Sequence, residues 1–315
     1  MSGLTVATYN VYLGADLALL FGATSIDDLA ARADVVRGQL DHTDFAQRAD
    51  AIARILVREG VDVVGLQEVT RWESAPVGTD GAIGEPAVLV DFLPLLVEAC
   101  AAAGAAYDVH AVNPNFAGGL PVGDSWMSIL GANVVLVRRD GAFTVTAERT
   151  GTFARTLEMP TGIAGVTFPV ARGWGWVEGE VDGRPLLFVS THTEAYDAGV
   201  RDAQRDELLA LVADHGRPVV LVGDLNARPD DVGVPPPYAD AWLAVGGDPT
   251  AGHTCGQAAE LDNERSALAE RIDYVFVRDA RVTACAVVGG EPDDRTVPDG
   301  LWPSDHAGVV ARLEF

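Results

Sequence analysis

Short apolar runs that end in polar side chains recur along the chain and constrain its fold more than any other feature. The clearest is residues 219–226, where four apolar residues lead through Gly223 to Asp224 and Asn226. Burying an unpaired carboxylate or amide is costly, whereas at the end of a strand residues i and i+2 face the same side. Asp224 and Asn226 therefore either face one cleft or form an Asx-type turn, and this stretch alone favours neither interpretation.

The order of the predicted elements favours an α/β fold. A β-branched strand is expected over residues 4–11, an amphipathic helix between Asp44 and Gly60, and a second strand over 61–66. Further strands are predicted at 132–137, 143–148, 166–171, 174–181, 185–190, 219–222, 271–277, 282–288 and 308–313, and further helices at 87–103, 200–214 and about 238–245.

The remaining segments are predicted to be loops. Residues 12–44 resemble an insertion with at most one short helix near 25–36, and residues 70–86, 113–125 and 227–265 are rich in Gly, Pro and polar residues. Asn113–Phe116 is expected to be a plain turn rather than the rim of a site, and Asp44 a helix N-cap. Since no repeat or low-complexity linker divides the chain, residues 1–315 are expected to form one domain with two sheets.

The charge and cysteine content limit the function. The chain has 46 acidic and 22 basic residues, and its net charge of −24 repels polyanions at long range. Its three cysteines lie far apart, which argues against a disulfide framework or a zinc site. No apolar stretch reaches the roughly 18 residues of a membrane span, and Met1–Leu4 shows no signal-peptide pattern. A cytoplasmic protein is therefore expected.

Polar groups at strand ends form one constellation: Asn10, Glu68, His192, Asp224, Asn226, Asp273, Asp305 and His306. A single histidine after a strand is more often a structural residue, but eight such groups together favour a site. Carboxylate and amide oxygens suit Mg²⁺ or Mn²⁺ rather than Zn²⁺, and a bound cation would allow an acidic cleft to hold a phosphate. Two histidines beside carboxylates can orient groups and transfer protons.

Six stretches resemble, in order, the motifs of the endonuclease/exonuclease/phosphatase superfamily, which includes DNase I and neutral sphingomyelinases. These stretches are Thr8-Tyr9-Asn10-Val11, Leu66-Gln67-Glu68-Val69, Ser190-Thr191-His192-Thr193-Glu194, Gly223-Asp224-Leu225-Asn226-Ala227, Arg271-Ile272-Asp273-Tyr274-Val275 and Ser304-Asp305-His306-Ala307-Gly308-Val309. The resemblance covers residues 4–313. It implies a DNase I-like four-layer α/β/β/α sandwich of two mixed β-sheets and Mg²⁺-dependent hydrolysis of a phosphate ester.

The resemblance also implies roles for the residues. Glu68 would be the main metal ligand with Asn10 beside it, and Asp305 a second ligand. Asp224 would orient and deprotonate the attacking water, which Asn226 would help to position. His306, supported by Asp273, would contact the scissile phosphate, and His192 would contact the phosphate or protonate the leaving group.

The substrate class stays open. Abasic-site endonucleases of this superfamily carry an acidic residue where this chain has Tyr12, which disfavours that branch. We expect a phosphomonoesterase or phosphodiesterase that acts on a small-molecule or lipid-like substrate; a DNase I-like nuclease and a non-catalytic binding protein are the alternatives. Arg172 beside Trp174 and Trp176 either binds phosphate or is a solvated neighbour of two packed rings. The sequence indicates no protein partner.

Overall fold

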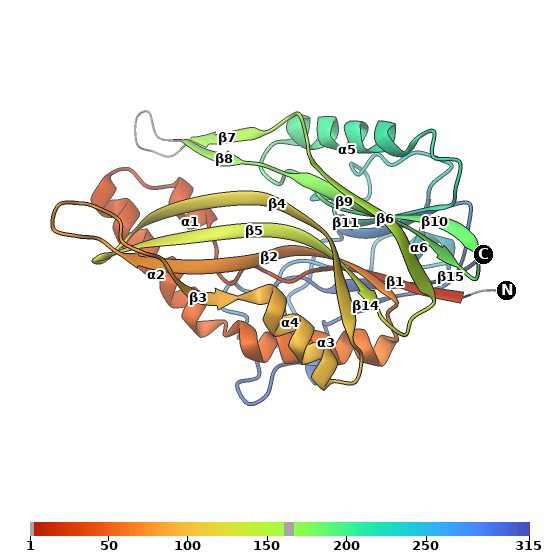
Figure 1. The fold of residues 1–315 in the computed structure, drawn as a ribbon, viewed down its shortest axis with the longest axis horizontal. Coiled ribbons are helices and arrows are strands. Elements are labelled where there is room, and N and C mark those ends of the chain that lie inside the picture. The colour runs from red at the N-terminus through yellow and green to blue at the C-terminus, as the bar shows by residue number, and fades with distance from the viewer. Residues whose placement is uncertain (1–2, 161–166) are drawn as a thin grey trace.

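Two β-sheets form the centre of the structure, a computed structural model that describes residues 3–160 and 167–315 (Figure 1). In spatial order, the seven-stranded sheet contains β14 (Arg281–Val288), β15 (Gly308–Glu314), β1 (Gly3–Asn10), β2 (Val63–Pro76), β5 (Ser125–Arg138) and β4 (Tyr107–Val122), with β3 (Ala87–Asp91) paired to β2. The six-stranded sheet contains β12 (Ala239–Asp240), β13 (Asp273–Arg278), β11 (Val219–Asp224), β10 (Arg184–His192), β9 (Gly173–Val181) and β6 (Phe143–Thr152). A separate hairpin pairs β7 (Leu157–Pro160) with β8 (Thr167–Val170).

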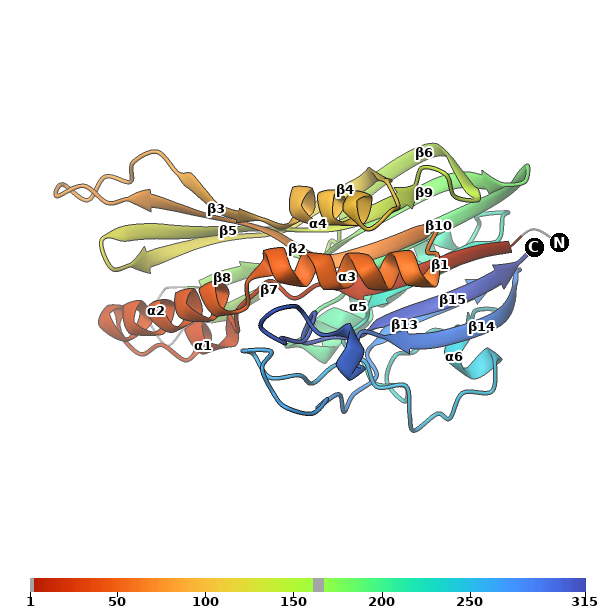
Figure 2. The ribbon, with the colours of Figure 1, turned by 90° about the horizontal axis from the view of Figure 1, so that it is seen from below.

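Both large sheets are mixed. Each contains one parallel pair, β1 with β2 and β10 with β11, among antiparallel pairs. β1 and β15 pair in register from Gly3 with Glu314, which brings the two ends of the chain side by side at one end of the sandwich (Figures 1 and 2). β1 runs from this end into the molecule, so Asn10 at its carboxyl end lies away from the termini.

Alternation along the strands creates three apolar layers. On β10, Leu186 and Phe188 pack between the two sheets, whereas Leu187 and Val189 face Leu208 of α5 (Ala198–Val212). The outer face of the seven-stranded sheet packs against α3 (Phe45–Glu59) and α4 (Phe92–Ala102). The predicted four-layer α/β/β/α sandwich of two mixed sheets is therefore confirmed (Figure 1).

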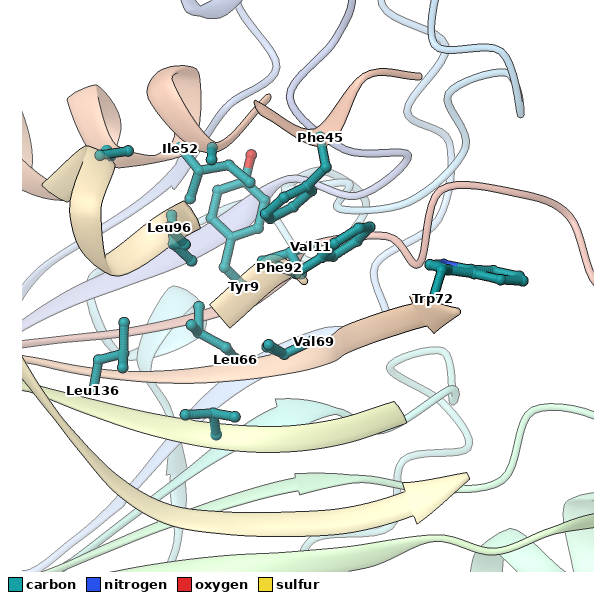
Figure 3. Close-up of a cluster of buried hydrophobic side chains, with 14 of the residues drawn as sticks. Tyr9, Val11, Phe45, Ile52, Leu66, Val69, Trp72, Phe92, Leu96 and Leu136 are labelled. Atoms are coloured by element: carbon teal, nitrogen blue, oxygen red, sulfur yellow. The ribbon is translucent and has the colours of Figure 1, made fainter. Parts of the chain in front are cut away.

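The core under α3 and α4 holds the strand ends that lead to the site. Tyr9 and Leu66, on neighbouring strands, pack beneath Ile52 of α3 and Leu96 of α4 (Figure 3). As predicted, Asp44 caps α3 by accepting a hydrogen bond from the Ala46 amide, and Gly60 ends the helix in the left-handed conformation, at φ 66°.

The two sheets approach each other closely at Gly65 of β2. A Cβ atom at this position would collide with the side chains of Ser190 and Val222 on the opposite sheet. Beside it, Gln67 Nε2 donates a 3.2 Å hydrogen bond to Ser190 Oγ, and Gln67 Oε1 accepts one of 3.1 Å from Thr8 Oγ1. A buried polar bridge thus joins the sheets one residue before Glu68.

Residues 12–44 are more helical than predicted. This segment contains α1 (Ala18–Phe21) and the 17-residue α2 (Ile26–His42), whose N-cap Ser25 accepts a hydrogen bond from the Asp28 amide. Its buried face is built mostly of small and medium side chains, Leu29, Ala33, Val36, Gln39 and Leu40. Many charged residues lie between these side chains, so the hydrophobic periodicity of α2 is weak in the sequence.

Two further loop predictions were wrong for one reason. Strand β2 continues through residues 70–76, and β4 and β5 extend residues 107–138 into one long hairpin that turns at Gly123. Asn113–Phe116 belongs to β4 and is not a turn. The helix predicted at 87–103 is shorter than expected, because β3 occupies residues 87–91 and α4 begins only at Phe92. Pairing with long neighbouring strands outweighs the low β-propensity of Gly, Pro and Asn here.

The other predicted elements form with small shifts, including α6 (Ala241–Ala244), and Asp182 and Gly183 form the hairpin turn between β9 and β10. A short 3₁₀ helix, η1 (Pro292–Asp294), precedes the last loop. Of the strand predicted at 166–171, Val166 lies outside the described residues and the rest contains β8. Cys100, Cys255 and Cys285 are free. Within residues 3–160 and 167–315, no helix is long and apolar enough to cross a membrane.

Candidate active site

Strand direction gathers the polar residues at one edge of the sandwich. In the seven-stranded sheet, the parallel pairing of β1 with β2 sets Asn10 opposite Gln67, and Glu68 follows. In the six-stranded sheet, β10 and β11 set His192 opposite Asp224, and antiparallel β13 sets Asp273 on the other side of Asp224. The carboxyl ends of parallel strands meet at the same sheet edge, so both sheets contribute to one cluster.

Asn10 connects the two halves of this cluster. Its Nδ2 donates to Glu68 Oε1 at 3.2 Å and to Asp224 Oδ2 at 3.1 Å. Its Oδ1 accepts the Tyr12 amide at 3.0 Å, and its main-chain carbonyl accepts Ser304 Oγ at 2.7 Å. The amide side chain is buried, and these bonds fix it between a carboxylate of each sheet.

Glu68 reaches the site because β2 is irregular at this point. The register of β2 against β5 shifts between Leu66 and Val69, and Glu68 has φ 60°, an uncommon conformation for a residue with a side chain. Glu68 Oε2 accepts the Leu13 amide at 2.8 Å. The bulge therefore turns a carboxylate out of the ladder while the strand continues behind it.

Both interpretations of Asp224 hold. Its Oδ1 accepts the Asn226 amide at 2.9 Å, which is an Asx-type turn. Its Oδ2 faces the cluster, 3.5 Å from His192 Nε2 and 3.8 Å from His306 Nε2. One carboxylate thus closes the turn and serves the site.

Asn226 does not follow the period-two expectation. The strand ends at Asp224, and Asn226 has φ 48°, so alternation does not continue to it. Asn226 Nδ2 donates to the carbonyl of Thr193 at 2.9 Å instead of facing the cleft beside Asp224. The bond holds the segment after His192 against the segment after Asp224.

The two histidines have opposite charge states because their neighbours differ. Burial alone would lower the pKa of His306, but the charges of Asp273 and Asp305 outweigh it and raise the pKa well above the usual value. His306 Nδ1 donates to Asp273 Oδ2 at 2.9 Å. For His192, burial and the positive charge of Arg172 lower the pKa well below the usual value. The site therefore holds one imidazolium and one neutral imidazole.

Crowding also disturbs the carboxylates. Burial and the nearby charge of Asp273 raise the pKa of Asp224 to about 6. Burial raises the pKa of Asp305 to about 7; the charge of Glu68 adds to this effect and that of His306 opposes it. We call Glu68, Asp224, Asp273 and Asp305 the carboxylate cluster; it concentrates more negative charge than its protein neighbours neutralise.

The composition of this cluster fits a hard divalent cation. Asp273 Oδ1 is buried and has no hydrogen-bond partner among the described residues. One ligand atom each from Asp224, Asp273 and His306 lie within 4.8 Å of one another. Glu68 and Asp305 supply further carboxylate oxygens at the edge of the adjoining pocket. Such oxygen-rich sets are typical of Mg²⁺ or Mn²⁺ sites.

A pocket of about 370 Å³ opens beside the cluster. Glu68, Asp305, Arg172 and His192 line it, whereas Asn10, Asp224, Asn226, Asp273 and His306 are not among its lining residues. Glu68 and Asp305 thus form the boundary between the pocket and the buried groups behind it.

Arg172 faces this pocket. Its Nη1 lies 3.2 Å from Nδ1 and 3.3 Å from Nε2 of His192. The neighbouring Trp174 and Trp176 pack against each other, with ring centroids 5.4 Å apart, and take part in the core under α5. The two tryptophans are thus packed rings, as one of the two interpretations of this stretch expected. Arg172 is not simply their solvated neighbour, because it lines the pocket.

Two buried residues support the site without having been singled out from the sequence. Arg48 of α3 donates to the carbonyls of Val11 at 2.6 Å, Tyr12 at 3.1 Å and Pro303 at 3.1 Å, so it ties the loop after β1 to the loop before His306. Its position on the buried face of a predicted helix was the available signal.

Glu194 is the second of these residues. It is fully buried, and its Oε2 lies 3.9 Å from Arg172 Nε. Neither atom has a hydrogen-bond partner among the described residues. Glu194 belongs to the motif stretch after His192, but the spacing gave no role for it.

Solved structures with the same fold have diverse activities. A truncated Caenorhabditis elegans TDP2 is 20% identical over 99% of this chain and 98% of its own, with a TM-score of 0.57. A Danio rerio TDP2 complexed with single strand DNA product is 17% identical over 100% of both chains, with a TM-score of 0.61. A mannosyl-6-phosphatase from Bacteroides thetaiotaomicron is 20% identical over 99% of this chain and 100% of its own, with a TM-score of 0.60.

At these identities the structural likeness establishes the fold alone. Comparison with curated protein sequences finds no match. The family model described as Endonuclease/Exonuclease/phosphatase family matches residues 7–306, which include every polar residue of the site. The chain therefore belongs to the endonuclease/exonuclease/phosphatase family.

Proposed function

We propose that this protein is a divalent-cation-dependent hydrolase of phosphate esters, with residues 1–315 acting as one catalytic domain. The observation that carries the proposal is a crowded carboxylate cluster with an imidazolium, His306, directly behind a pocket that is lined by Glu68, Asp305 and a guanidinium, Arg172. Negative charge develops on phosphoryl oxygens during transfer, and such donors stabilise it. A cytoplasmic location is part of this proposal and rests on the sequence alone.

Glu68 and Asp305 would hold Mg²⁺ or Mn²⁺, with Asn10 beside Glu68. The Asp224, Asp273 and His306 trio is a poorer choice, because a protonated histidine that donates to Asp273 is not available as a ligand. The cation would supply positive charge to the phosphate and to water. Its charge would also oppose the burial and the carboxylate repulsion that raise the pKa values of Asp224 and Asp305.

The pKa values suit Asp224, His306 and His192 to different roles in the reaction. With a pKa of about 6, Asp224 is ionised at neutral pH and more basic than an ordinary carboxylate, which suits a group that orients and deprotonates water. His306 would donate a charged hydrogen bond to the phosphate, held in orientation by Asp273. Neutral His192 and Arg172, which both line the pocket, would also bind the phosphate. Asn226 would fix the segment that carries His192 rather than touch water.

A nuclease of DNase I type is the alternative that the TDP2 neighbours favour. The pocket argues against it, because Arg172 is the one arginine among its lining residues, and the whole chain contains no lysine. A polyanionic strand needs several cations along its backbone. A small-molecule or lipid-like phosphate ester therefore remains the proposed substrate.

The test is hydrolysis of a panel of phosphate monoesters and diesters with Mg²⁺, with Mn²⁺ and with EDTA. Turnover that EDTA abolishes and that His306→Ala lowers by at least a hundredfold is expected. His42→Ala, a half-exposed histidine on α2, is the matched control and should leave the rate unchanged. Absence of metal-dependent turnover would refute the proposal, whereas faster cleavage of plasmid or single-stranded DNA than of any small ester would establish the nuclease alternative and exclude the small-molecule substrate. Absence of divalent-cation binding in calorimetry would favour a binding protein instead.

A further inference from the structure

The pocket beside the carboxylate cluster has two kinds of lining residue. Glu68, Asp305, Arg172 and His192 are among its polar and charged residues. Its large apolar residues come from other parts of the chain: Leu13, Leu17, Phe21, Phe116, Ile129 and Val170. Such a combination, an apolar wall with a few convergent polar groups, is typical of small-molecule sites.

Aromatic rings from four segments of the chain contact one another at these apolar residues. Phe21 of α1 contacts Tyr196 edge-on, with centroids 5.5 Å apart, and Phe168 of β8 at 6.3 Å. Phe168 in turn stacks with Phe116 of β4 at 6.2 Å. Rings in such contact stabilise one another, so the wall is formed before a ligand arrives.

These side chains are not covered by the fold. Phe21 and Phe116 are only half-buried, and Tyr196 keeps 49% of its surface exposed beside the pocket. Apolar surface left open at the mouth of a charged site loses the stabilisation that burial would give. An apolar group of the ligand would cover it.

The charges of the pocket allow only one phosphate. Arg172 is its single guanidinium, and Asp16 joins Glu68 and Asp305 among the lining acids. Once one phosphate engages Arg172 and the cation proposed at Glu68 and Asp305, a second phosphate, or a strand of nucleic acid, would find no further cationic side chain among the described lining residues. A cavity of about 150 Å³ holds a benzene-sized group, so 370 Å³ leaves room for one ring and one phosphate.

On these grounds we propose that the substrate is a single phosphate ester of an apolar alcohol about the size of one ring, whose hydrocarbon part packs between Phe116, Phe21 and Leu17. This inference rests on the proposed function and names the substrate class of the same site. Hydrolysis breaks the bond between phosphorus and the ester oxygen. Water supplies the new phosphate oxygen, and one of its protons goes to the departing alcohol.

The experiment compares benzyl phosphate with glycerol phosphate, because both release alkyl alcohols of similar basicity and differ in the apolar ring. With Mg²⁺, kcat/KM for benzyl phosphate should be at least about tenfold higher. Phe116→Ala should lower kcat/KM for benzyl phosphate by roughly tenfold and leave glycerol phosphate within about twofold. Phe315→Ala removes an equally half-buried phenylalanine at the far end of β15 and should change neither value.

Equal kcat/KM for the two esters, an equal loss on both in Phe116→Ala, or faster cleavage of an oligonucleotide would overturn the substrate assignment while the hydrolase proposal stands. Phe21→Ala gives a second test if Phe116→Ala fails to fold, as judged by its thermal unfolding.

Calorimetric binding of benzylphosphonate, which cannot be hydrolysed, separates the two proposals. If no ester is turned over, the proposed function fails. Benzylphosphonate binding that Phe116→Ala weakens would still uphold the assignment of the pocket. Binding no tighter than that of methylphosphonate would refute the assignment.

Discussion

The Nδ1 atom of His306 lies 2.9 Å from Oδ2 of Asp273, and both side chains are buried at the edge where the two sheets meet. This hydrogen bond fixes the ring so that Nε2 faces Asp224, 3.8 Å away. The same contact raises the pKa of His306, so orientation and charge depend on one carboxylate.

Replacing Asp273 with Asn should therefore change the pH dependence of the reaction and not only its rate. Without the carboxylate charge, the pKa of His306 falls, and His306 loses its proton at a lower pH than in the wild type. The alkaline limb of the kcat/KM profile should move to lower pH, with a loss of about 10² to 10⁴ above it. An unmoved limb would contradict the role of Asp273, and His306→Ala should show no such limb.

Glu68 and Asp305 should control cation affinity. Glu68→Gln or Asp305→Asn removes a charged oxygen ligand, and each should weaken Mg²⁺ or Mn²⁺ binding by at least about tenfold in calorimetry. Asp16→Asn is the control, because Asp16 also lines the pocket but its Oδ1 accepts the Ala18 amide rather than joining the cluster. Equal affinities in the three variants would place the cation elsewhere.

Without a cation, the carboxylate cluster should destabilise the fold as pH rises. The pKa values of Asp224 and Asp305, about 6 and about 7, lie above those of unfolded Asp, so the folded state binds more protons between pH 4 and 7. Their contribution to stability is present below pH 4 and is lost as pH rises through 7.

In EDTA at pH 8, Asp305→Asn should thus be more stable to urea than the wild type, by roughly 1–3 kcal/mol. At about pH 3 the two should be alike, since Asp305 is then mostly protonated in both the folded and the unfolded wild type. Saturating Mg²⁺ should remove or reverse the difference at pH 8. A less stable Asp305→Asn protein in EDTA would show that the cluster does not strain the cation-free fold.

Arg48 should be a large single contributor to stability. Arg48→Met leaves the buried carbonyls of Val11, Tyr12 and Pro303 without a donor, and a loss of about 3–5 kcal/mol in the free energy of unfolding is expected. Arg54 lies on the same helix but is exposed, and Arg54→Met should cost no more than about 0.5 kcal/mol. Urea unfolding measures both, and similar losses would contradict the anchoring role.

Glu194 should act through Arg172. Glu194→Gln removes the charge 3.9 Å from Arg172 Nε, so the guanidinium loses its buried partner and is held less firmly. KM for a phosphate ester should rise by roughly tenfold with a smaller change in kcat, because binding is affected more than chemistry. In an Arg172→Gln background, the Glu194→Gln change should add little. An unchanged loss in that background would give Glu194 a separate role.

Much of the fold follows from local sequence. The strands that end at Asn10, His192 and Asp224 are short and apolar, and α3 carries a cap at each end. The spacing of apolar residues and the capping residues therefore identify these elements. The long hairpin of β4 and β5 could not be found in this way, because Gly, Pro and Asn within β4 join the strand only through pairing with β5. Only tertiary structure reveals that preference.

For the site, the sequence predicted which polar residues gather but not how they are arranged. Spacing suggested that Asn226 faces the cleft with Asp224, whereas a left-handed residue ends the alternation. The opposite shifts in the pKa values of His192 and His306 depend on burial and on neighbours from other strands or loops, Arg172 for His192 and Asp273 for His306. Such neighbours are known only once the strands are paired.

Gly65 gives core packing a catalytic consequence. Asn10 and Glu68 belong to one sheet and His192 and Asp224 to the other, so the gap between the sheets sets the width of the reaction centre. A methyl group at Gly65 would push against Ser190 and Val222 and separate the two halves. Redesign of the interior for greater thermostability should therefore leave this glycine in place, because a residue that never meets substrate fixes the dimension on which turnover depends.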